Sequence, residues 1–507
     1  MFKKVNSCAV CGIDGKLIGV EVDISEGLPA YTMVGSLSSS VKESGERVRT
    51  ALKNSNFHLP PKRITVNLTP ADIRKSGSGF DLPITTALLM CMGIKPEIDF
   101  DKTVILGELS LNGLICPIPG VLPMLSHCYK QGYTSCIVPF NNVNEAMLIE
   151  GLSVIGIKSI DSLVAYMSGG APDFYGIGGA AVSLNNTGNY SVDFSEIKGQ
   201  HTLKRGIEIA VAGFHNVLMT GAAGAGKSMI AKRLPTIMPT LSFEESIEIT
   251  KIYSAGGFLM DNCSLITERP FRAPHHTISK IALVGGGSTP HPGEVSLAHN
   301  GVLFLDELPE FSKNVLEVLR QPIEDRQVTI SRINASYIFP SDFMLIAAMN
   351  PCPCGNYPNL SRCKCSPYEI RRYQNKISGP LLDRMDINIE VHPIKYEELF
   401  EHASEESSSD IRQRVEDARE IQKRRYRDDH ILFNSQLDGK LTSKYIRLSP
   451  ECEEILKASF QSDNLSARGV YRILKLSRTI ADLNRNDNIS VSDIREAIFY
   501  RNTHTKG

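Results

Sequence analysis

The chain has 507 residues, of which 42% are hydrophobic and 22% charged, a balance typical of a soluble globular protein with several domains. No window approaches the roughly 18 apolar residues of a membrane span, and no apolar segment follows the charged start Met-Phe-Lys-Lys, so we expect no membrane anchor, no signal peptide and a cytoplasmic location. A net charge of −1 excludes a uniformly basic nucleic-acid binder but leaves room for a basic ring or channel.

The first 170 residues mix strand and helix patterns and predict an α+β domain with its own core. Alternating or apolar runs predict strands, and helical spacing of apolar residues predicts helices. The predicted strands cover 17–24, 63–68, 104–106 and 136–138, and the predicted helices cover 38–54 and 82–92. Residues 171–190 are rich in Gly, Ser and Asn and predict a linker.

Two segments of this first domain, Ala71–Ile84 and Leu106–Gly113, resemble the proteolytic domain of the Lon proteases, where a serine works with a lysine. That chemistry needs a nucleophile beside a base. In this chain Gly79 stands at the position of the serine and Leu122 at that of the lysine, and the nearby serines do not match. We therefore expect a Lon-like fold, related to ribosomal S5 domain 2, without peptidase chemistry, which serves assembly or contact with a protein partner or DNA.

From Asp193 onward strands and helices alternate, as in a parallel sheet covered by helices. An apolar run at 216–220 predicts a buried strand, and a helix is predicted over 229–234, ending at Pro235. The loop between them, Gly-Ala-Ala-Gly-Ala-Gly-Lys-Ser, matches every fixed position of a P-loop, so a plain glycine-rich turn is the weaker reading. Its backbone N–H groups would hold ATP phosphates, its lysine would reach the β- and γ-phosphates and its serine would hold Mg²⁺. The residues assigned to this binding are Gly221, Gly224, Gly226, Lys227 and Ser228.

Two further apolar strands end in polar side chains. Residues 301–305 lead into Asp306 and Glu307, and residues 343–349 lead into Asn350. In open α/β sheets ligands bind at the carboxyl ends of the strands. We expect Asp306 to hold Mg²⁺, Glu307 to polarise the attacking water and Asn350 to position that water against the γ-phosphate.

Arginines beyond this region are candidates for stabilising the charge of phosphoryl transfer. Arg384, in Leu-Leu-Asp-Arg, is a candidate finger toward a neighbouring subunit, although it could instead pair with Asp383 or Asp386 on the surface. Arg468 begins a helix capped by a serine and is a candidate sensor, and Arg472, one turn on, is not excluded. The helices predicted after residue 396 form a lid that closes over the nucleotide.

Twelve cysteines in a cytoplasmic chain indicate reduced thiols or a metal site, not a disulfide framework. Two Cys-x-Cys pairs follow Asn350 within one short loop, and four thiolates can enclose a tetrahedral Zn²⁺ ion. The pairs are Cys352 with Cys354, and Cys363 with Cys365. A structural zinc would brace this loop; reduced buried thiols are the main alternative and a redox pair is a lesser one.

These motifs together resemble the magnesium-chelatase-like group of AAA+ ATPases, and with the Lon-like domain the chain resembles the YifB/ComM family over essentially its full length. The resemblance implies an ATP-driven homo-hexameric ring that uses Mg²⁺ and acts on single-stranded or branched DNA, as a branch-migration helicase in recombination or natural transformation. The irregular stretch 269–294 resembles the insert that points into the pore of related rings, where Arg272 and Lys280 suit contact with phosphates. Its pair His275 and His276 could bind metal, but packing and hydrogen bonding are the favoured roles.

The expected fold is therefore α/β, an AAA+ P-loop core with an all-helical lid behind an α+β Lon-like domain. The expected boundaries are 1–170 for the Lon-like domain, 171–190 for the linker, 191–395 for the core and 396–507 for the lid. A protein-remodelling ATPase of the chelatase type is the alternative function. A Lon-like peptidase is a weaker one.

The basic run Lys423–Arg427 could touch DNA, but a solvated helix face is the default.

Overall fold

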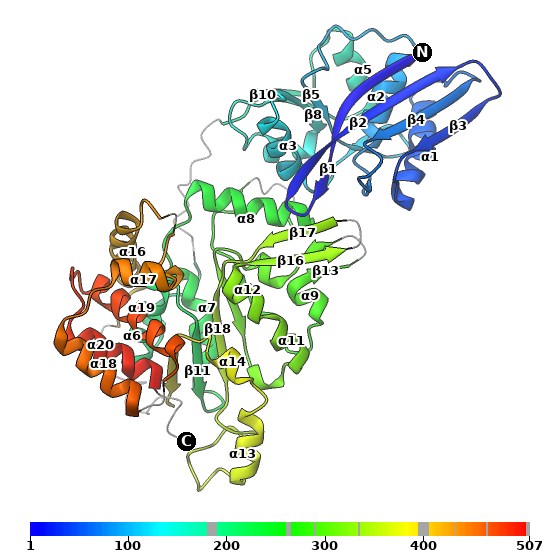
Figure 1. The fold of residues 1–507 in the computed structure, drawn as a ribbon. Coiled ribbons are helices and arrows are strands. Elements are labelled where there is room, and N and C mark those ends of the chain that lie inside the picture. The colour runs from blue at the N-terminus through cyan, green and yellow to red at the C-terminus, as the bar shows by residue number, and fades with distance from the viewer. Residues whose placement is uncertain are drawn as a thin grey trace.

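The computed structural model describes residues 1–179, 190–259, 265–287, 290–332, 335–393, 405–429, 431–462 and 465–502. The N-terminal domain lies at one end, next to an α/β core, and a helical block lies beside that core (Figure 1). The predicted boundary between core and lid, at 395–396, and residues 180–189 of the predicted linker lie outside the described residues.

The N-terminal domain is built on an eight-stranded mixed sheet with the strand order β10-β9-β8-β5-β1-β2-β4-β3. The strands are β1 (Phe2–Cys11), β2 (Asp14–Ser25), β3 (Ala30–Val34), β4 (Arg63–Thr69), β5 (Thr103–Ile105), β8 (Ser135–Pro139), β9 (Ser153–Ile157) and β10 (Phe174–Ile177). A small ladder joins β6 (Glu108–Leu109) to β7 (Ile115–Cys116). The helices are α1 (Ser39–Asn54), α2 (Asp81–Cys91), α3 (Val121–Lys130), α4 (Val143–Ala146) and α5 (Ile160–Met167), with a 3₁₀ turn, η1 (Phe140–Asn142).

Successive side chains of a strand point to opposite faces of its sheet, and the central strands use both faces to bury apolar groups. On β1, Val5 and Ala9 join the hydrophobic cluster that contains α1 and α2. Cys8, between them in sequence, joins the cluster that contains α3 and α4. The predicted strands and helices of this domain are all present, which confirms the α+β class.

Part of the predicted linker is a strand. β10 pairs antiparallel with β9 at the edge of the N-terminal sheet, with Phe174 opposite Gly156 and Ile177 opposite Ser153. β10 has only four residues within a segment rich in Gly, and its side chains are exposed or only partly buried, so the sequence shows no alternating pattern there. Pairing with β9 makes it part of the sheet, so the domain extends at least to Ile177.

The core contains a five-stranded sheet with the order β12-β15-β18-β11-β19, and all its strand pairs are parallel. The strands are β11 (Val217–Gly221), β12 (Phe271–Arg272), β15 (Val302–Leu305), β18 (Met344–Met349) and β19 (Ile387–Val391). Two hairpins join β13 (Gly285–Gly286) to β14 (His291–Pro292) and β16 (Gln327–Arg332) to β17 (Ala335–Pro340). The helices are α6 (His201–Gly213), α7 (Lys227–Ile237), α8 (Phe243–Gly256), α9 (Lys280–Val284), α10 (Glu294–Leu297), α11 (Lys313–Val318), α12 (Arg320–Asp325), α13 (Pro367–Gln374) and α14 (Gly379–Leu382), with 3₁₀ turns η2 (Phe194–Glu196) and η3 (Leu308–Glu310).

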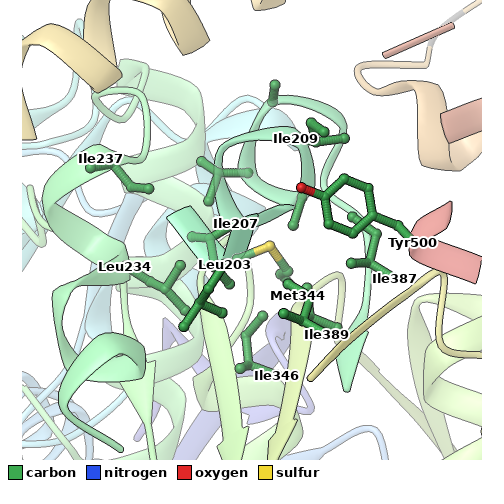
Figure 2. Close-up of a cluster of buried hydrophobic side chains, with 14 of the residues drawn as sticks. Leu203, Ile207, Ile209, Leu234, Ile237, Met344, Ile346, Ile387, Ile389 and Tyr500 are labelled. Atoms are coloured by element: carbon green, nitrogen blue, oxygen red, sulfur yellow. The ribbon is translucent and has the colours of Figure 1, made fainter. Parts of the chain in front are cut away.

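Helices cover both faces of this sheet. Side chains of α6 and α7 pack on one face against Met344, Ile346, Ile387 and Ile389 (Figure 2). Leu218 and Leu303 point to the other face, where α9, α10 and α11 contribute the partners. This confirms the predicted parallel α/β core and places the carboxyl ends of all five strands at one edge.

Helix α7 does not end at Pro235 as predicted but runs on to Ile237. Proline removes one N–H from the helix ladder, and here that loss falls in the last turn. Leu234 and Ile237 are fully buried in the core, and the Thr236 hydroxyl donates a 2.7 Å hydrogen bond to the Arg233 carbonyl. Burial of the turn outweighs the missing bond.

The helical block comprises α16 (Ser408–Arg425), α17 (Gly439–Tyr445), α18 (Pro450–Ser462), α19 (Ala467–Leu483) and α20 (Val491–Asn502), with a 3₁₀ turn, η4 (Asn434–Gln436). It shares a hydrophobic cluster with the core, because Ile473 and Ile480 of α19 and Tyr500 of α20 are buried with side chains of α6 and the sheet (Figure 2). Among the described residues, no helix combines the length and the apolar character needed to cross a bilayer.

Candidate nucleotide site

The glycine-rich loop joins the carboxyl end of β11 to the start of α7 and depends on its glycines. A β-carbon on Gly221 would lie 2.4 Å from the carbonyl oxygen of Val391, so only glycine lets β11 approach β19 here. Gly224 and Gly226 have φ of +79° and +89°, a left-handed conformation that other residues adopt only with strain. The loop therefore has the backbone freedom to turn its N–H groups toward a phosphate.

Lys227, the first residue of α7, is folded back over this loop. Its ammonium donates hydrogen bonds to the carbonyl oxygens of Gly221 (2.6 Å) and Ala222 (2.9 Å) and to Oδ1 of Asn350 (3.1 Å). Burial lowers the pKa of Lys227, and the carboxylates of Asp306 and Glu307 oppose that shift. The structure thus brings the predicted lysine and the predicted sensor asparagine into direct contact.

Ser228 and Asp306 meet beside the lysine. The Ser228 hydroxyl donates to Oδ2 of Asp306 at 2.5 Å, across the gap between α7 and the end of β15. Hydroxyl and carboxylate oxygens are the hard ligands that Mg²⁺ prefers, usually together with water and phosphate oxygens. The donor set fits the expected ion.

Glu307 follows Asp306 and turns toward solvent. Its φ is +51°, and its backbone N–H donates to Oδ1 of Asp306 at 2.9 Å. Its side chain is 56% exposed, and Oε2 lies 3.6 Å from Nδ1 of His276. A non-glycine residue in the left-handed region often marks a functional site. The turn aims the carboxylate into the open side of the site.

His276, considered from the sequence only as part of a histidine pair, is the residue that the motifs did not place at this site. Its ring lies 4.0 Å from that of His275 and meets the edge of Phe311 at 6.4 Å, measured between ring centroids. The signal that could have found it is topological: β12 pairs with β15, so the residues that follow β12 reach the same edge as Asp306. Within the described residues His275 and His276 belong to no group of three or more potential metal ligands.

Arg384 lies at the opposite edge of the sheet, just before β19, and is 5% exposed. Nη2 pairs with Glu324 at 2.6 Å and Nη1 donates to the Pro380 carbonyl at 2.6 Å. Its Nε is buried with no hydrogen-bond partner in the described part of the chain. The alternative pairing with Asp383 or Asp386 is wrong, because those carboxylates pair with Arg501 (3.7 Å) and Arg472.

Arg468 lies near the same far edge, where a cavity of about 520 Å³ separates the core from the helical block. Residues that precede strands line it, Asn216 before β11 and Phe343 before β18, together with Arg468 and Arg472. Burial alone would raise the pKa of Asp386, but Arg472 and His215 outweigh it and hold that pKa well below its usual range. The two predicted sensor candidates therefore differ: Arg468 is exposed, and Arg472 is engaged in an ion pair.

The helical block packs at this far edge. Arg412 of α16 donates to the carbonyl of Thr236, at the end of α7 away from the loop, at 2.9 Å. Thr479 of α19 contacts His215, before β11, at 2.8 Å. These contacts do not fit the prediction that the block closes over the nucleotide of its own chain, since the loop at Gly221 lies at the other end of β11.

In the pore-type insert, Arg272, a predicted phosphate contact, is engaged in an ion pair. Its guanidinium makes a two-pronged pair with Glu294, at 2.6 and 2.7 Å. The pair is partly exposed and joins β12, which ends at Arg272, to the start of α10 at Glu294. Lys280, the other predicted phosphate contact, begins α9 and is exposed.

The four cysteines after Asn350 converge, although eight residues separate the two pairs. The Sγ atom of Cys352 lies 3.4 Å from that of Cys354 and 3.7 Å from that of Cys363, and the Sγ atoms of Cys354 and Cys363 are 3.6 Å apart. All four sulfurs, including that of Cys365, lie within 4.8 Å of one another. A hydrogen bond from the Asn356 backbone, with help from the neighbouring thiols, lowers the pKa of Cys354 to about 6.

These distances match a tetrahedral metal shell. Zinc–sulfur bonds of about 2.3 Å place the sulfurs of a Cys₄ site about 3.8 Å apart. The arrangement is compatible with zinc.

In the N-terminal domain the Lon-like positions lack catalytic groups. Leu122 is fully buried, and its backbone N–H donates to Oε1 of Glu145 at 2.8 Å. The Ser78 hydroxyl, near Gly79, donates to Glu108. Serine beside an acid is not the nucleophile–base pair that the chemistry requires.

The chain is similar to known proteins along most of its length. Family models match along it: "Magnesium chelatase, subunit ChlI" at residues 193–399, "Subunit ChlI of Mg-chelatase" at 20–142 and the ChlI C-terminal model at 405–501. Competence protein ComM of Haemophilus influenzae is 39% identical, covering 98% of this chain and 97% of ComM. The uncharacterized protein YifB of Escherichia coli is 39% identical, over 98% of this chain and 96% of YifB. Lon protease 2 of Bacillus subtilis is 28% identical over 32% of each chain.

Proposed function

This chain belongs to the magnesium-chelatase-like AAA+ family that includes YifB and ComM, and from that membership we propose that it is an ATP-hydrolysing ring motor that acts on DNA. The observation that carries the proposal is the meeting of Lys227, Ser228, Asp306, Glu307 and Asn350 at one edge of a parallel sheet. The reaction is hydrolysis of ATP to ADP and phosphate.

Each side chain at this edge has one task. The backbone of the loop and the Lys227 ammonium bind the phosphates, exchanging the carbonyl contacts that Lys227 makes here. Glu307 accepts the proton of the attacking water, and Asn350 holds that water in line. Mg²⁺, held by Ser228 and Asp306, would neutralise the charge that develops on the phosphate oxygens.

The arginines require a second subunit. Arg384 and Arg468 lie at the amino ends of the strands, whereas Lys227 follows a carboxyl end. In a head-to-tail ring the far edge of one subunit faces the nucleotide edge of the next. We propose a homo-hexamer in which Arg384 and Arg468 of one subunit stabilise the transition state in its neighbour.

DNA is the proposed substrate because ComM, similar over its whole length, is named a competence protein. Single-stranded or branched DNA would pass through the pore, and branch migration is the activity that the resemblance implies. The cytoplasmic location stays a prediction. The second candidate, remodelling of a protein partner, is favoured by the magnesium chelatase names of the three family models.

The test measures ATP turnover by the full-length protein with single-stranded, duplex and branched DNA. We expect branched or single-stranded DNA to raise turnover several-fold, and Lys227→Ala to abolish it with every DNA. Stimulation by a protein alone, with indifference to all DNA, would replace the DNA motor by the protein-remodelling function. Turnover by Lys227→Ala equal to that of the unaltered protein would refute the assigned site.

We also propose that Cys352, Cys354, Cys363 and Cys365 hold a structural Zn²⁺ ion, supported by the sulfur distances. The N-terminal domain, without a serine–lysine pair, would serve assembly or contact a partner. Peptidase activity has no support in the residues at Gly79 and Leu122.

A further inference from the structure

The cysteine loop forms part of the wall of the nucleotide site. It begins directly after Asn350, and its first turn, Cys352-Pro-Cys354-Gly355, is closed by a 3.0 Å hydrogen bond from the Gly355 N–H to the Cys352 carbonyl. Gly355 has φ +75°, and a β-carbon built on it would lie 3.5 Å from Cβ and N of Ala223 and 3.9 Å from Cγ of Asn350. The tip of this turn therefore lies against both the phosphate-binding loop and the sensor side chain.

The turn has few other supports. The Tyr357 N–H donates to the Cys352 sulfur at 3.4 Å, and the Gln374 side chain donates to the Pro351 carbonyl at 3.2 Å. Cys352 is buried, while Cys354 is exposed and Cys363 and Cys365 are partly exposed. A metal ion would close the chain from Cys352 to Cys365 and fix the turn from its outer side.

We propose that zinc in the cysteine site controls the affinity for nucleotide by holding the Cys352–Gly355 turn against Ala223 and Asn350. The route is short. One residue, Pro351, separates Cys352 from Asn350, and Asn350 accepts a hydrogen bond from Lys227 at 3.1 Å. Without the metal the turn samples positions away from Ala223, and binding must then pay the entropy of ordering it.

The inference rests on the proposed function, because it concerns the same nucleotide site. If the fraction of chains with an ordered turn falls to about a tenth, the apparent dissociation constant for nucleotide rises about tenfold.

The experiment uses the full-length protein in three forms: unaltered, Cys363→Ser, and Cys116→Ser as a control with a half-buried thiol on β7. Metal content is measured by mass spectrometry and affinity with a fluorescent ADP analogue. We expect one zinc per chain in the unaltered and Cys116→Ser proteins, and for Cys363→Ser we expect loss of zinc with about tenfold weaker ADP binding. Thermal unfolding of each form, followed by circular dichroism, reports whether the fold survives.

A further variant tests the inference if Cys363→Ser folds poorly. Gly355→Val leaves all four thiols in place but puts a branched side chain at a left-handed position beside Ala223, so it should retain zinc and still bind ADP more weakly. An unaltered protein without zinc, or a zinc-free protein that binds ADP as tightly as the zinc form, overturns the inference. Failure of the unaltered, zinc-containing protein to bind ADP overturns the proposed function instead.

Discussion

Two inactive variants, Lys227→Ala and Arg384→Ala, should restore activity to each other when their subunits are mixed. Lys227 follows the carboxyl end of β11, and Arg384 precedes its parallel neighbour β19. β11 has five residues, and at about 3.3 Å per residue it separates the two edges by about 16 Å. An arginine side chain is too short to cross that distance, so the proposed mechanism needs Lys227 from one chain and Arg384 from another to complete a site.

The expected recovery of ATP turnover follows from the share of subunit interfaces that keep both Lys227 and Arg384. Loss of an arginine finger costs about 10³-fold or more in turnover, and loss of the P-loop lysine removes phosphate binding. In a ring assembled at random from equal amounts of both variants, about half of the sites keep Lys227 and about half of the neighbours facing them keep Arg384. About one quarter of the interfaces are then complete, and turnover should reach about a quarter of that of the unaltered protein.

The assay is phosphate release, measured after the variants have been mixed in a series of ratios and left to exchange subunits. A maximum at equal amounts is expected. Lys227→Ala mixed with Glu307→Gln is the matched control, because both changes fall on the same edge and no interface becomes complete. Arg384 is buried beside Glu324, so native mass spectrometry must show that Arg384→Ala enters mixed rings. Mixed rings that stay inactive at every ratio would refute the separation of the two residues between subunits.

Three further changes test other parts of the structure. Glu307→Gln should bind ATP but turn it over at least about a hundredfold more slowly, since general-base catalysis contributes about 10²–10⁴; tight ATP binding with normal turnover would move the base elsewhere. His276→Ala should keep basal turnover but lose the stimulation of turnover by DNA, because His276 lies between the insert and Glu307. His275→Ala should keep this stimulation, because His275 contacts Thr277, at 2.9 Å. Asp386→Asn should lower the free energy of unfolding by about 3 kcal/mol by leaving Arg472 unpaired, against under about 1 kcal/mol for the half-exposed Asp383→Asn, both measured by denaturant unfolding. Because the folded-state pKa of Asp386 is depressed, its contribution is present above the unfolded value of about 4 and is lost as pH falls below it.

The residues at the nucleotide edge of the sheet could be predicted from the sequence, because each is identified by the apolar strand that it ends or follows. Each of Gly221, Asp306 and Asn350 ends or directly follows an apolar strand, and parallel strands place their carboxyl ends together. Only the parallel class of the sheet had to be known to place these residues together. The place of His276 at this edge could not be predicted, because β12 has two residues with only partly buried side chains and is too short to show a strand pattern.

The far edge could not be predicted in the same way. The position of Arg468 depends on how α19 packs, and that is decided by Ile473 and Ile480 entering the cluster of α6 and the sheet, and by Thr479 meeting His215. The helical pattern of α19 predicts an apolar face but not the surface that this face covers. The same limit explains β10, whose pairing with β9 is a property of the partner strand.

The N-terminal domain contacts the core beside Leu122. The Leu122 N–H donates to Glu145, and Glu145 also accepts a hydrogen bond from Ser254 of α8, a helix of the core. Leu265 of the core is buried in the cluster of α3. In Figure 1, α8 runs beneath this domain, and the β16–β17 hairpin approaches the turn between β1 and β2.

This contact ties the N-terminal domain to the core. Burial raises the pKa of Glu145, and a buried carboxyl group that makes hydrogen bonds in both domains is costly to separate from either. At the hairpin, a β-carbon on Gly12 would lie 3.5 Å from the carbonyl oxygen of Ile338. Any movement of α8 or of the hairpin would therefore displace the N-terminal domain. A leucine at the position of the Lon lysine leaves no base for peptidase chemistry, and its backbone supports the joint between the two domains.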